Sequence, residues 1–366
     1  MNKFFSLIVV ALCMVMVSCS QSQGYKINVN FANQDFDGKK AYLTNYDTGD
    51  TIDSATVADK YLSLNGDVDS AYYARIIVDG NRFGMVVEPG VINVEWGEEI
   101  IARGTTLNDK LNQMNDQMVK LDKQWEEIES DFKSGKITEE VASKQNAALE
   151  EKQMSLLYST YISNKNNALG PWAFTNYLIY KQFSTAQLDS ILNTAPGNYR
   201  GYKRVLKAQS DAKAVESTAV GKKYTDFTMK SLDGKTQNLR DFIGNDGNFT
   251  VVDFWASWCA PCRAEIQGAL TKLYNKYNGK GVKVIGVAVW DKPEDTKAAI
   301  DQLKIPWEVM MDDHYTTVPT DLYGISGIPH IMVVDPDGII VSRGLQGEPL
   351  VQYIDMIMEK KNSIQN

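Results

Sequence analysis

The chain has 366 residues, of which 43% are hydrophobic and 10% aromatic. This length allows two or three domains with real cores, and the composition excludes a disordered protein. The formal net charge of −8 and the pI near 5.0 argue against any face that neutralises a phosphate backbone, so nucleic acid is excluded as a partner.

The N-terminus has the pattern of an export signal. Lys3 precedes an apolar stretch over residues 4–17, which is shorter than the roughly 20 residues that span a bilayer. Ser18 and Cys19 follow, and a small residue before a cysteine resembles a bacterial lipoprotein signal, whose cleavage leaves that cysteine as the lipid-modified first residue. We therefore expect a signal peptide over residues 1–18, a lipid anchor at Cys19, and a periplasm-facing protein of the cell envelope on the outer or inner membrane. A simple cleaved signal and a retained anchor are the alternatives.

The cysteines of the mature chain are then few. The sequence has four, Cys13, Cys19, Cys259 and Cys262. Removal of the signal and acylation of Cys19 leave Cys259 and Cys262 as the only free thiols. Many small exported domains depend on structural disulfides, but here no other cysteine remains to form one.

Residues 25–104 have the pattern of a small antiparallel β-sandwich-like domain. Apolar side chains alternate at Ile27, Val29 and Phe31, and further short apolar runs are separated by turn residues, as in domains of short strands. Other local cues are Asp53-Ser54, Glu88-Pro89-Gly90, Gly104-Thr105 and Leu107-Asn108. With these cues the segment resembles the N-terminal β-domain of unknown function that precedes redox domains in some exported lipoproteins. It carries no assignable chemistry.

Residues 105–215 change to a helical pattern. Apolar side chains recur in alternating steps of four and three, which predicts a helical seam of more than three heptads: Leu107, Leu111, Met114, Met118, Leu121, Trp125, Ile128 and Phe132. Thr106 with Asp109 supplies an N-terminal capping pattern, and a second helix is expected from Thr138. The pair predicts an antiparallel hairpin; the alternative is a coiled coil that makes a homodimer through the 107–132 helix. Further helices are expected over residues 171–183, 185–192 and 199–213.

Residues 218–366 have an α/β pattern. Apolar runs predict strands over residues 250–255, 282–289, 331–334 and 339–341. Helical patterns are expected over residues 261–277, 293–303 and 348–361. Strands that alternate with helices indicate a sheet covered by helices.

Cys259 and Cys262 lie where the strand over residues 250–255 is followed by a helix, with Pro261 between them. A thiolate in the first turn of a helix meets the positive end of the helix dipole and unpaired backbone N–H groups, which lower its pKa below that of a free thiol. We therefore predict that Cys259 is the nucleophile. Cys262, one turn further on, is predicted to displace a mixed disulfide and to close the redox-active Cys259–Cys262 disulfide.

Two other uses of this cysteine pair are possible. A zinc half-site needs two more ligands, and the two histidines of the chain, His314 and His330, lack the short spacing of structural zinc sites. We therefore expect no metal and no cofactor. A purely structural disulfide is the second alternative, although Pro261 is typical of a helix start and Trp258 flanks the nucleophile.

About 150 residues toward the C-terminus carry an ordered set of motifs. They are residues 224–227, 232–235 and 239–242, then residues 252–265 around the cysteines, and then Gly327-Ile328-Pro329-His330. This set closely resembles the exported thioredoxin-like proteins of the TlpA/ResA type. The resemblance implies a thioredoxin-like α/β fold for residues 218–366 and thiol–disulfide oxidoreductase activity.

The resemblance also implies a substrate-binding surface. Pro329 corresponds to a cis-proline that packs opposite the active-site cysteines, and a cis bond before proline costs little compared with other cis peptides. Ile328 precedes it and offers its backbone to an extended substrate segment. Trp258 is expected to cover the thiols and to form part of the docking surface. An ordinary trans-proline and plain packing of the indole are the alternatives.

Charged residues near the cysteines are further candidates. Asp253 matches the buried acid of thioredoxins, whose raised pKa lets it exchange a proton with the resolving thiol; many TlpA/ResA proteins have asparagine there. The alternative is a satisfied polar residue without a catalytic role. Glu265 matches an acidic residue that tunes thiol pKa, or is a plain exposed helix glutamate. His330 either makes thiol reactivity depend on pH or, as we favour, lies on the rim. Arg263 either adds a positive field at Cys259 or is a solvated helix charge.

The expected function is that of a membrane-tethered thiol–disulfide oxidoreductase that reduces disulfides of envelope proteins, with a membrane electron donor as partner. The direction rests on the resemblance alone, because roughly 1.4 kcal/mol corresponds to about 30 mV, which residue identities do not fix. The alternatives are a disulfide oxidase or isomerase and a thiol peroxidase, although the Pro and Thr pattern of peroxidatic sites is absent before Cys259. A surface-binding lipoprotein with an accessory redox domain is the non-enzymatic alternative.

Overall fold

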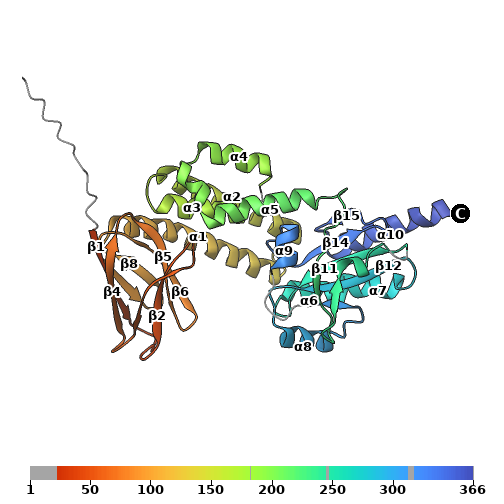
Figure 1. The fold of residues 1–366 in the computed structure, drawn as a ribbon, viewed down its shortest axis with the longest axis horizontal. Helices are drawn as coiled ribbons and strands as arrows, with labels where there is room; N and C mark the ends of the chain where they lie inside the picture. The colour runs from red at the N-terminus through yellow and green to blue at the C-terminus, as the bar shows by residue number, and fades with distance from the viewer. Residues whose placement is uncertain (1–22, 182, 245–246, 312–316, 366) are drawn as a thin grey trace, which may run out of the picture. The chain divides into compact units, whose positions relative to one another are not determined.

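The computed structural model describes residues 23–181, 183–244, 247–311 and 317–365 (Figure 1). The predicted signal peptide and Cys19 lie outside the described residues. The chain folds into two compact units, Met1–Tyr180 and Lys181–Asn366, and each is described by itself. In the part of the chain that the structure describes, no helix is both long enough and apolar enough to cross a membrane.

The first unit contains a sandwich of two four-stranded sheets. One sheet has the strand order β4 (Tyr61–Val68), β1 (Gln23–Phe31), β7 (Gly90–Trp96), β8 (Ile100–Arg103), and the other has β3 (Thr51–Thr56), β2 (Lys40–Asn45), β5 (Tyr72–Val78), β6 (Asn81–Val87). The alternating Ile27, Val29 and Phe31 are fully buried, as their period of two predicts. The antiparallel prediction is confirmed for every strand pair in these sheets except β1 with β7, which run parallel.

Helices cover one end of this sandwich. The predicted hairpin is formed by α1 (Thr106–Lys133) and α2 (Glu139–Ser163), and α3 (Leu169–Tyr180) packs on α2. The seam of α1 is buried at its start, where Leu107, Leu111 and Met114 pack against Val86 of β6. Burial fades along the helix, and Phe132 leaves 46% of its surface exposed.

The N-terminus of α1 differs from the predicted cap. The expected pattern of Thr106 with Asp109 is wrong, because the helix begins after Thr105, whose side chain accepts no cap hydrogen bond. Instead Glu88, 19 residues upstream, accepts the backbone N–H groups of Leu107 at 2.7 Å and Asn108 at 3.3 Å. A carboxylate here satisfies free N–H groups and meets the positive end of the helix dipole.

Replacing Glu88 therefore tests how the helical hairpin is joined to the sandwich. We expect Glu88→Ala to lower the free energy of unfolding by about 1–2 kcal/mol, as for the loss of a helix cap, and Glu88→Gln to lower it less because an acceptor oxygen remains. Urea unfolding of residues 23–180, followed by circular dichroism, measures both. Equal stability of Glu88→Ala and the unmodified unit would contradict the assignment.

The second unit is built around a five-stranded sheet. Its strand order is β13 (Val309–Met310), β12 (Val282–Ala288), β11 (Phe249–Trp255), β14 (His330–Val334), β15 (Ile340–Arg343), and a separate hairpin pairs β9 (Thr228–Lys230) with β10 (Thr236–Asn238). The strands β11, β12 and β13 run parallel, whereas β14 and β15 are antiparallel to their neighbours. The prediction of an α/β unit is confirmed; β13 was not expected from the sequence.

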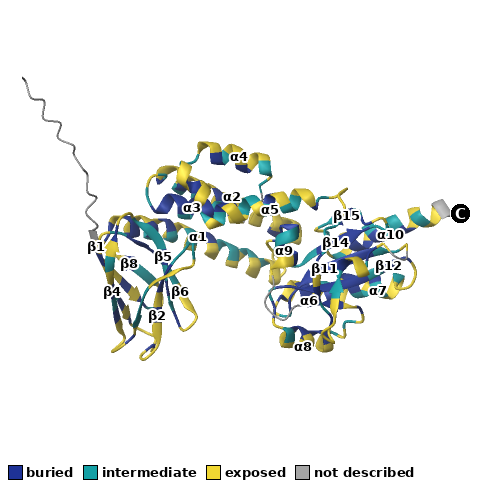
Figure 2. Ribbon diagram, viewed as in Figure 1, coloured by how far each residue is buried: buried dark blue, intermediate teal, exposed yellow. Residues whose placement is uncertain are grey.

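Helices and loops cover both faces of this sheet. The helices of the unit are α4 (Thr185–Thr194), α5 (Lys203–Ser217), α6 (Ala260–Glu265), α7 (Thr271–Tyr277), α8 (Pro293–Leu303), α9 (Val318–Tyr323) and α10 (Gly347–Gln365), with 3-10 turns η1 (Gly197–Gly201) and η2 (Leu239–Asp241). The predicted helix over residues 261–277 is continuous but contains a π-turn, η3 (Ile266–Leu270). Figure 2 shows the sheet as the most deeply buried part of this unit.

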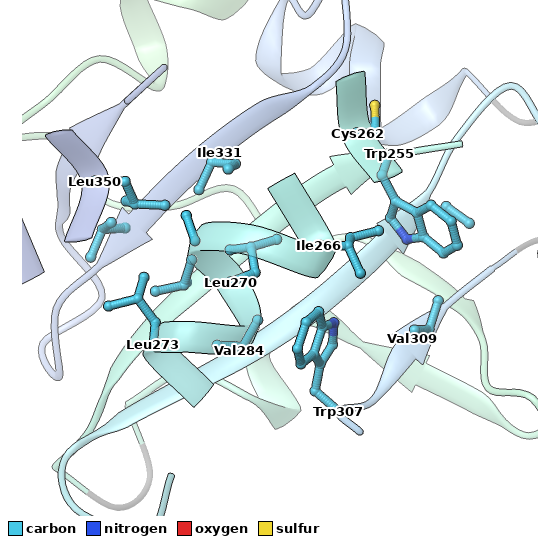
Figure 3. Packing of buried hydrophobic residues seen from close by; sticks show 14 of the residues in the cluster. Trp255, Cys262, Ile266, Leu270, Leu273, Val284, Trp307, Val309, Ile331 and Leu350 are labelled. Atoms are coloured by element: carbon cyan, nitrogen blue, oxygen red, sulfur yellow. The ribbon is translucent and has the colours of Figure 1, made fainter. Parts of the chain in front are cut away.

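Alternate residues of β11 belong to different cores. Val251 and Trp255 pack with α6, α7 and α10, whereas Val252 and Phe254 pack with α9 and the β9–β10 hairpin on the opposite face. Figure 3 shows the first core, in which Cys262 lies beside Trp255. The helix α6 therefore rests on the face of β11 that carries its odd-numbered residues.

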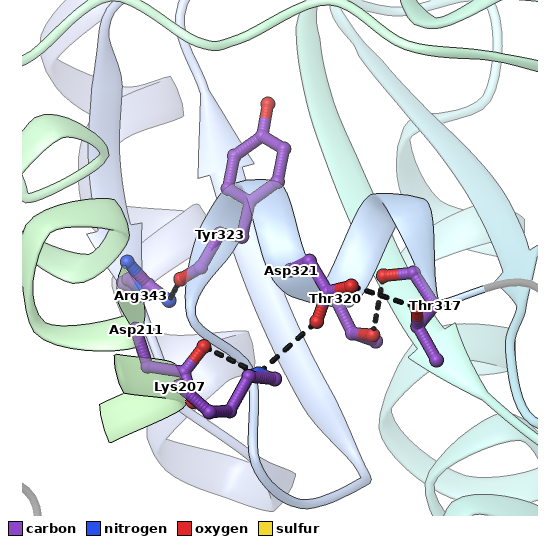
Figure 4. Close-up of polar contacts among 7 residues, drawn as sticks. All are labelled: Lys207, Asp211, Thr317, Thr320, Asp321, Tyr323 and Arg343. Atoms are coloured by element: carbon purple, nitrogen blue, oxygen red, sulfur yellow. Dashed lines mark hydrogen bonds and ion pairs between the residues drawn. The ribbon is translucent and has the colours of Figure 1, made fainter. Parts of the chain in front are cut away.

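Polar contacts connect helix α5 to α9 and to β15 of the same unit (Figure 4). Lys207 of α5 contacts Asp211 and, at 3.1 Å, Asp321 of α9. Arg343 of β15 donates to the carbonyl of Tyr323 and, at 2.8 Å, to the hydroxyl of Thr218 at the end of α5. The packing of this unit therefore extends well before residue 218.

Candidate active site

Cys259 and Cys262 lie at the start of α6, directly after β11. Cys259 is the N-cap residue, Pro261 lies in the first turn, and the two cysteines form a disulfide. Proline suits this turn because its missing N–H would have no partner there. The Cys259 sulfur accepts the backbone N–H of Cys262 at 3.2 Å. Both cysteines are buried: Cys259 keeps 4% of its surface exposed and Cys262 none.

Trp258 lies beside Cys259 and is 59% exposed. Its indole N–H donates to the carbonyl of Trp290 at 3.0 Å, so the ring is held although it faces solvent. An aromatic side chain in this state presents a large apolar surface next to Cys259. The docking role of Trp258 stays a prediction.

Ile328 and Pro329 lie in the segment before β14, and Ile328 packs against the core that contains both cysteines. The Ile328–Pro329 peptide bond is cis, and the Pro329 carbonyl accepts the side chain of Gln346 at 2.9 Å. β14 begins at the next residue, His330, which pairs with Phe254 of β11. This register puts Pro329 beside the end of β11, four residues before Cys259.

Asp253 is fully buried in the middle of β11. Side chains alternate along the strand, so Asp253 lies on the same face as Val251 and Trp255. Both cysteines pack on this face. Neither carboxyl oxygen has a hydrogen-bond partner among the described residues. Desolvation, with a smaller contribution from the charge of Glu265, raises the pKa of Asp253 well above its usual value.

Glu265, at the end of α6, is half-buried. Its carboxylate accepts the backbone N–H of Gly347 at 2.9 Å, at the first residue of α10. It therefore connects the helix of the cysteines to the C-terminal helix and places a negative charge near Asp253. This contact is a structural one that the sequence pattern did not indicate.

His330 does not lie on the rim of the cysteine site. It pairs with Phe254, so it faces the opposite side of the sheet, where its Nε2 accepts Arg343 Nε at 3.0 Å. Burial and the Arg343 charge lower the pKa of His330 to about 4. The rim assignment is therefore wrong, and so is direct tuning of the thiols, because the register turns the ring away from them.

Arg263 is half-buried, and its guanidinium has two hydrogen-bond partners. It donates to the carbonyl of Ser257 at 3.3 Å and to the side chain of Gln302 on α8 at 2.8 Å. These contacts brace the loop before the cysteines, and the positive field at Cys259 stays a prediction.

Sequence reasoning also missed Asp291, a buried carboxylate shortly after the neighbouring strand β12. It accepts the backbone N–H of Ser257 at 2.6 Å and the Ser257 hydroxyl at 2.9 Å. The sequence could have indicated this contact, because Asp291 follows β12 as Ser257 follows β11. Parallel strands bring the residues that follow them to the same edge of a sheet.

Comparisons with known proteins agree with this geometry. The AhpC/TSA family matches residues 220–343, and a domain of unknown function, DUF4369, matches residues 25–111. Thiol-disulfide oxidoreductase ResA of Bacillus thuringiensis subsp. konkukian is 29% identical over 145 residues, which are 40% of this chain and 80% of that protein. Thiol:disulfide interchange protein DsbE of Escherichia coli K12 is 29% identical over 133 residues, 36% of this chain and 69% of that protein.

A solved structure matches the same region. The thioredoxin domain of a thiol-disulfide oxidoreductase from Bacteroides vulgatus is 33% identical and covers 38% of this chain and 98% of that chain, with a TM-score of 0.35. The chain is a thioredoxin-like thiol–disulfide oxidoreductase. The predicted fold of the C-terminal region and the predicted class of enzyme are thereby confirmed. Among the described residues of the oxidoreductase, no three or more His, Cys, Asp or Glu side chains are grouped as metal ligands.

The buried carboxyl of Asp253 gives the oxidoreductase a testable pH dependence. Because its pKa is raised in the folded state, the folded chain keeps a proton above about pH 4 that the unfolded chain releases. Stability then falls with rising pH until the folded pKa is reached. We expect Asp253→Asn to gain stability relative to the unmodified protein by about 1.4 kcal/mol per pH unit in that window.

Urea unfolding of the oxidised protein between pH 5 and 8, followed by tryptophan fluorescence, measures this difference. Asp295→Asn, an exposed position on α8, is the matched control. Parallel pH curves for Asp253→Asn and the unmodified protein would contradict a raised pKa.

Proposed function

We propose that Cys259 is the nucleophile of this oxidoreductase and that Cys262 resolves the intermediate. The Cys259 thiolate attacks one sulfur of a protein disulfide, and the other substrate sulfur leaves as a thiolate. The Cys262 thiolate then attacks the Cys259 sulfur, which releases the second substrate thiol and forms the Cys259–Cys262 disulfide. Two electrons pass from the dithiol to the substrate. The supporting observation is the N-cap position of Cys259, which keeps 4% of its surface exposed, whereas Cys262 keeps none.

Asp253 is proposed to exchange the proton of the resolving thiol. Its carboxyl lies on the face of the sheet where Cys262 packs, and burial raises its pKa. The raised pKa makes the ionised carboxylate of Asp253 a stronger base, so it can take the proton of the Cys262 thiol and leave the thiolate that attacks Cys259. The Glu265 charge contributes to the raised pKa, so we assign Glu265 a tuning role that acts through Asp253.

Substrate binding is proposed at Trp258, Ile328 and Pro329. These residues come from the loop before α6 and from the segment before β14, which the pairing of β11 with β14 brings together. Trp258 supplies exposed apolar surface, and the backbone of Ile328 is available to an extended substrate segment. The substrate class that fits is a disulfide in an unfolded or extended protein segment.

The proposed direction is reduction of envelope protein disulfides, with electrons supplied by a membrane donor. The names of the ResA and DsbE relatives support thiol–disulfide exchange. We further propose a lipid anchor at Cys19 facing the periplasm, and self-association through the exposed end of α1 near Phe132. Oxidase or isomerase activity uses the same two cysteines and differs only in redox poise.

Trapping of the intermediate tests the two cysteine roles. We expect Cys262→Ser to accumulate a mixed disulfide with a protein substrate such as insulin, because no thiol is left to resolve it. Cys259→Ser should form none, and both variants should lose insulin reduction with dithiothreitol. Non-reducing gels with mass spectrometry detect the adduct.

Two results would contradict these roles, and a third would favour a different reaction. Insulin reduction by both variants at the rate of the unmodified protein would remove the dithiol mechanism. A stable adduct on Cys259→Ser instead of Cys262→Ser would reverse the assignment. Consumption of hydrogen peroxide by Cys262→Ser, with no insulin reduction by the unmodified protein, would favour the peroxidase alternative.

Membrane attachment is tested by labelling. We expect the full-length protein, expressed in a bacterium with lipoprotein processing, to incorporate radiolabelled palmitate and to sediment with membranes. Cys19→Ser should lose the label, because no other thiol is presented at the processing site, whereas Cys13→Ser should keep it. An unlabelled protein in the soluble periplasmic fraction would contradict the anchor.

A further inference from the structure

Asp291 is connected to the cysteine loop by both of its carboxylate oxygens. Oδ2 accepts the Ser257 backbone N–H at 2.6 Å and the Thr296 hydroxyl at 3.0 Å. Oδ1 accepts the Ser257 hydroxyl at 2.9 Å and the Lys292 backbone N–H at 2.9 Å. Only 7% of Asp291 is exposed, and hydrogen bonds to a buried charged group are among the stronger ones in proteins.

These four contacts specify a carboxylate. Each oxygen faces one backbone N–H, that of Ser257 or that of Lys292, and a backbone N–H can only donate. An asparagine would have to direct its NH₂ group at one of these two donors, whichever way its amide is turned. The site therefore distinguishes aspartate from an amide of the same size.

The residue before Asp291 holds the neighbouring side chain. Trp290 has a φ of 55°, a conformation that costs a residue other than glycine about 1 kcal/mol or more. This bend directs its carbonyl to the indole N–H of Trp258 at 3.0 Å. The same turn thus fixes Ser257 through Asp291 and Trp258 through Trp290.

Ser257 is braced from its other side as well. Its carbonyl accepts Arg263, whose second amino group reaches Gln302 of α8. The N–H, the hydroxyl and the carbonyl of Ser257 are therefore all engaged, two residues before Cys259. The loop that presents the cysteine is positioned by groups outside it.

We propose that Asp291 is a positioning residue of the oxidoreductase: through Ser257 and the adjoining Trp290 turn, it sets the orientation of Trp258 beside Cys259 and thereby the recognition of protein disulfides. This inference rests on the proposed role of Cys259 as nucleophile. A protein substrate must pack on the surface around the sulfur, whereas a small disulfide needs access to the sulfur alone. Loss of Asp291 should therefore affect the two kinds of substrate differently.

The test compares insulin with the small disulfide 5,5′-dithiobis(2-nitrobenzoic acid) on the full-length protein. We expect Asp291→Asn to lower kcat/KM for insulin by about tenfold, since misplaced binding groups cost this much or more. The rate with the small disulfide should change by about twofold or less. Ser257→Ala keeps the backbone N–H contact and should give a smaller change in the same direction.

Two controls separate positioning from stability. Asp295→Asn changes an exposed carboxylate on the helix that follows Asp291, and Thr296→Val removes one bond to Asp291 while leaving both contacts to Ser257. Thermal unfolding of every variant shows which are folded at the assay temperature. We expect Thr296→Val to lose stability but to keep the ratio of the two rates.

The outcomes are distinct. An unchanged ratio of insulin to small-disulfide rates in Asp291→Asn and Ser257→Ala would overturn the positioning role, as would an equal shift of that ratio in Thr296→Val. If Asp291→Asn does not fold, Ser257→Ala alone decides by the same ratio. A failure of the proposed function is separate, because the unmodified protein would then reduce neither substrate through Cys259.

Discussion

The parallel pairing of β11 with β12 is the constraint on which the site depends. Its register sets Trp255 beside Ala288, so the two strands end together. The backbone N–H of Val289 donates a hydrogen bond of 2.9 Å to the carbonyl of Trp255, which continues the pairing beyond the end of β12. The loop that precedes Cys259 therefore starts next to the loop of Asp291. The hydrogen bonds that hold the cysteine loop come from this neighbouring loop and from α6 itself.

The strand β11 is buried on both faces, and this burial explains the shifted pKa values of Asp253, on β11, and of His330, on the neighbouring β14. A charge in such a strand is costly unless it is paired or neutralised. On the face of the cysteines, Asp253 has a raised pKa and no partner among the described residues. On the opposite face, His330 stays neutral above about pH 4 and accepts a hydrogen bond from Arg343. Because side chains alternate between the two faces along β11 and β14, His330 lies on the face opposite the cysteines.

Local patterns in the sequence predicted most of the fold. The cysteine motif between an apolar strand and a helix, the seam from Leu107, and the α/β alternation all have short-range causes. What was missed depends on pairing between distant segments. The cap of α1 comes from Glu88, 19 residues away, and the parallel pairing of β1 with β7 joins strands separated by five others. The side of the sheet that His330 faces follows from its register with Phe254, which one sequence does not fix.

The middle helices do not form a unit of their own. The helices α1, α2 and α3 belong to the unit of the sandwich, and α4 and α5 belong to the catalytic unit. The end of α5 is bound there by Arg343, whose guanidinium contacts Thr218, Tyr323 and His330. His330 directly follows the cis-proline, so one side chain connects the end of α5 to the strand that carries the proposed docking segment. Moving α5 away would break the two hydrogen bonds from Arg343, a half-buried charge, to Thr218, each worth roughly 1.5–3 kcal/mol, which is why we regard α5 as part of the redox unit.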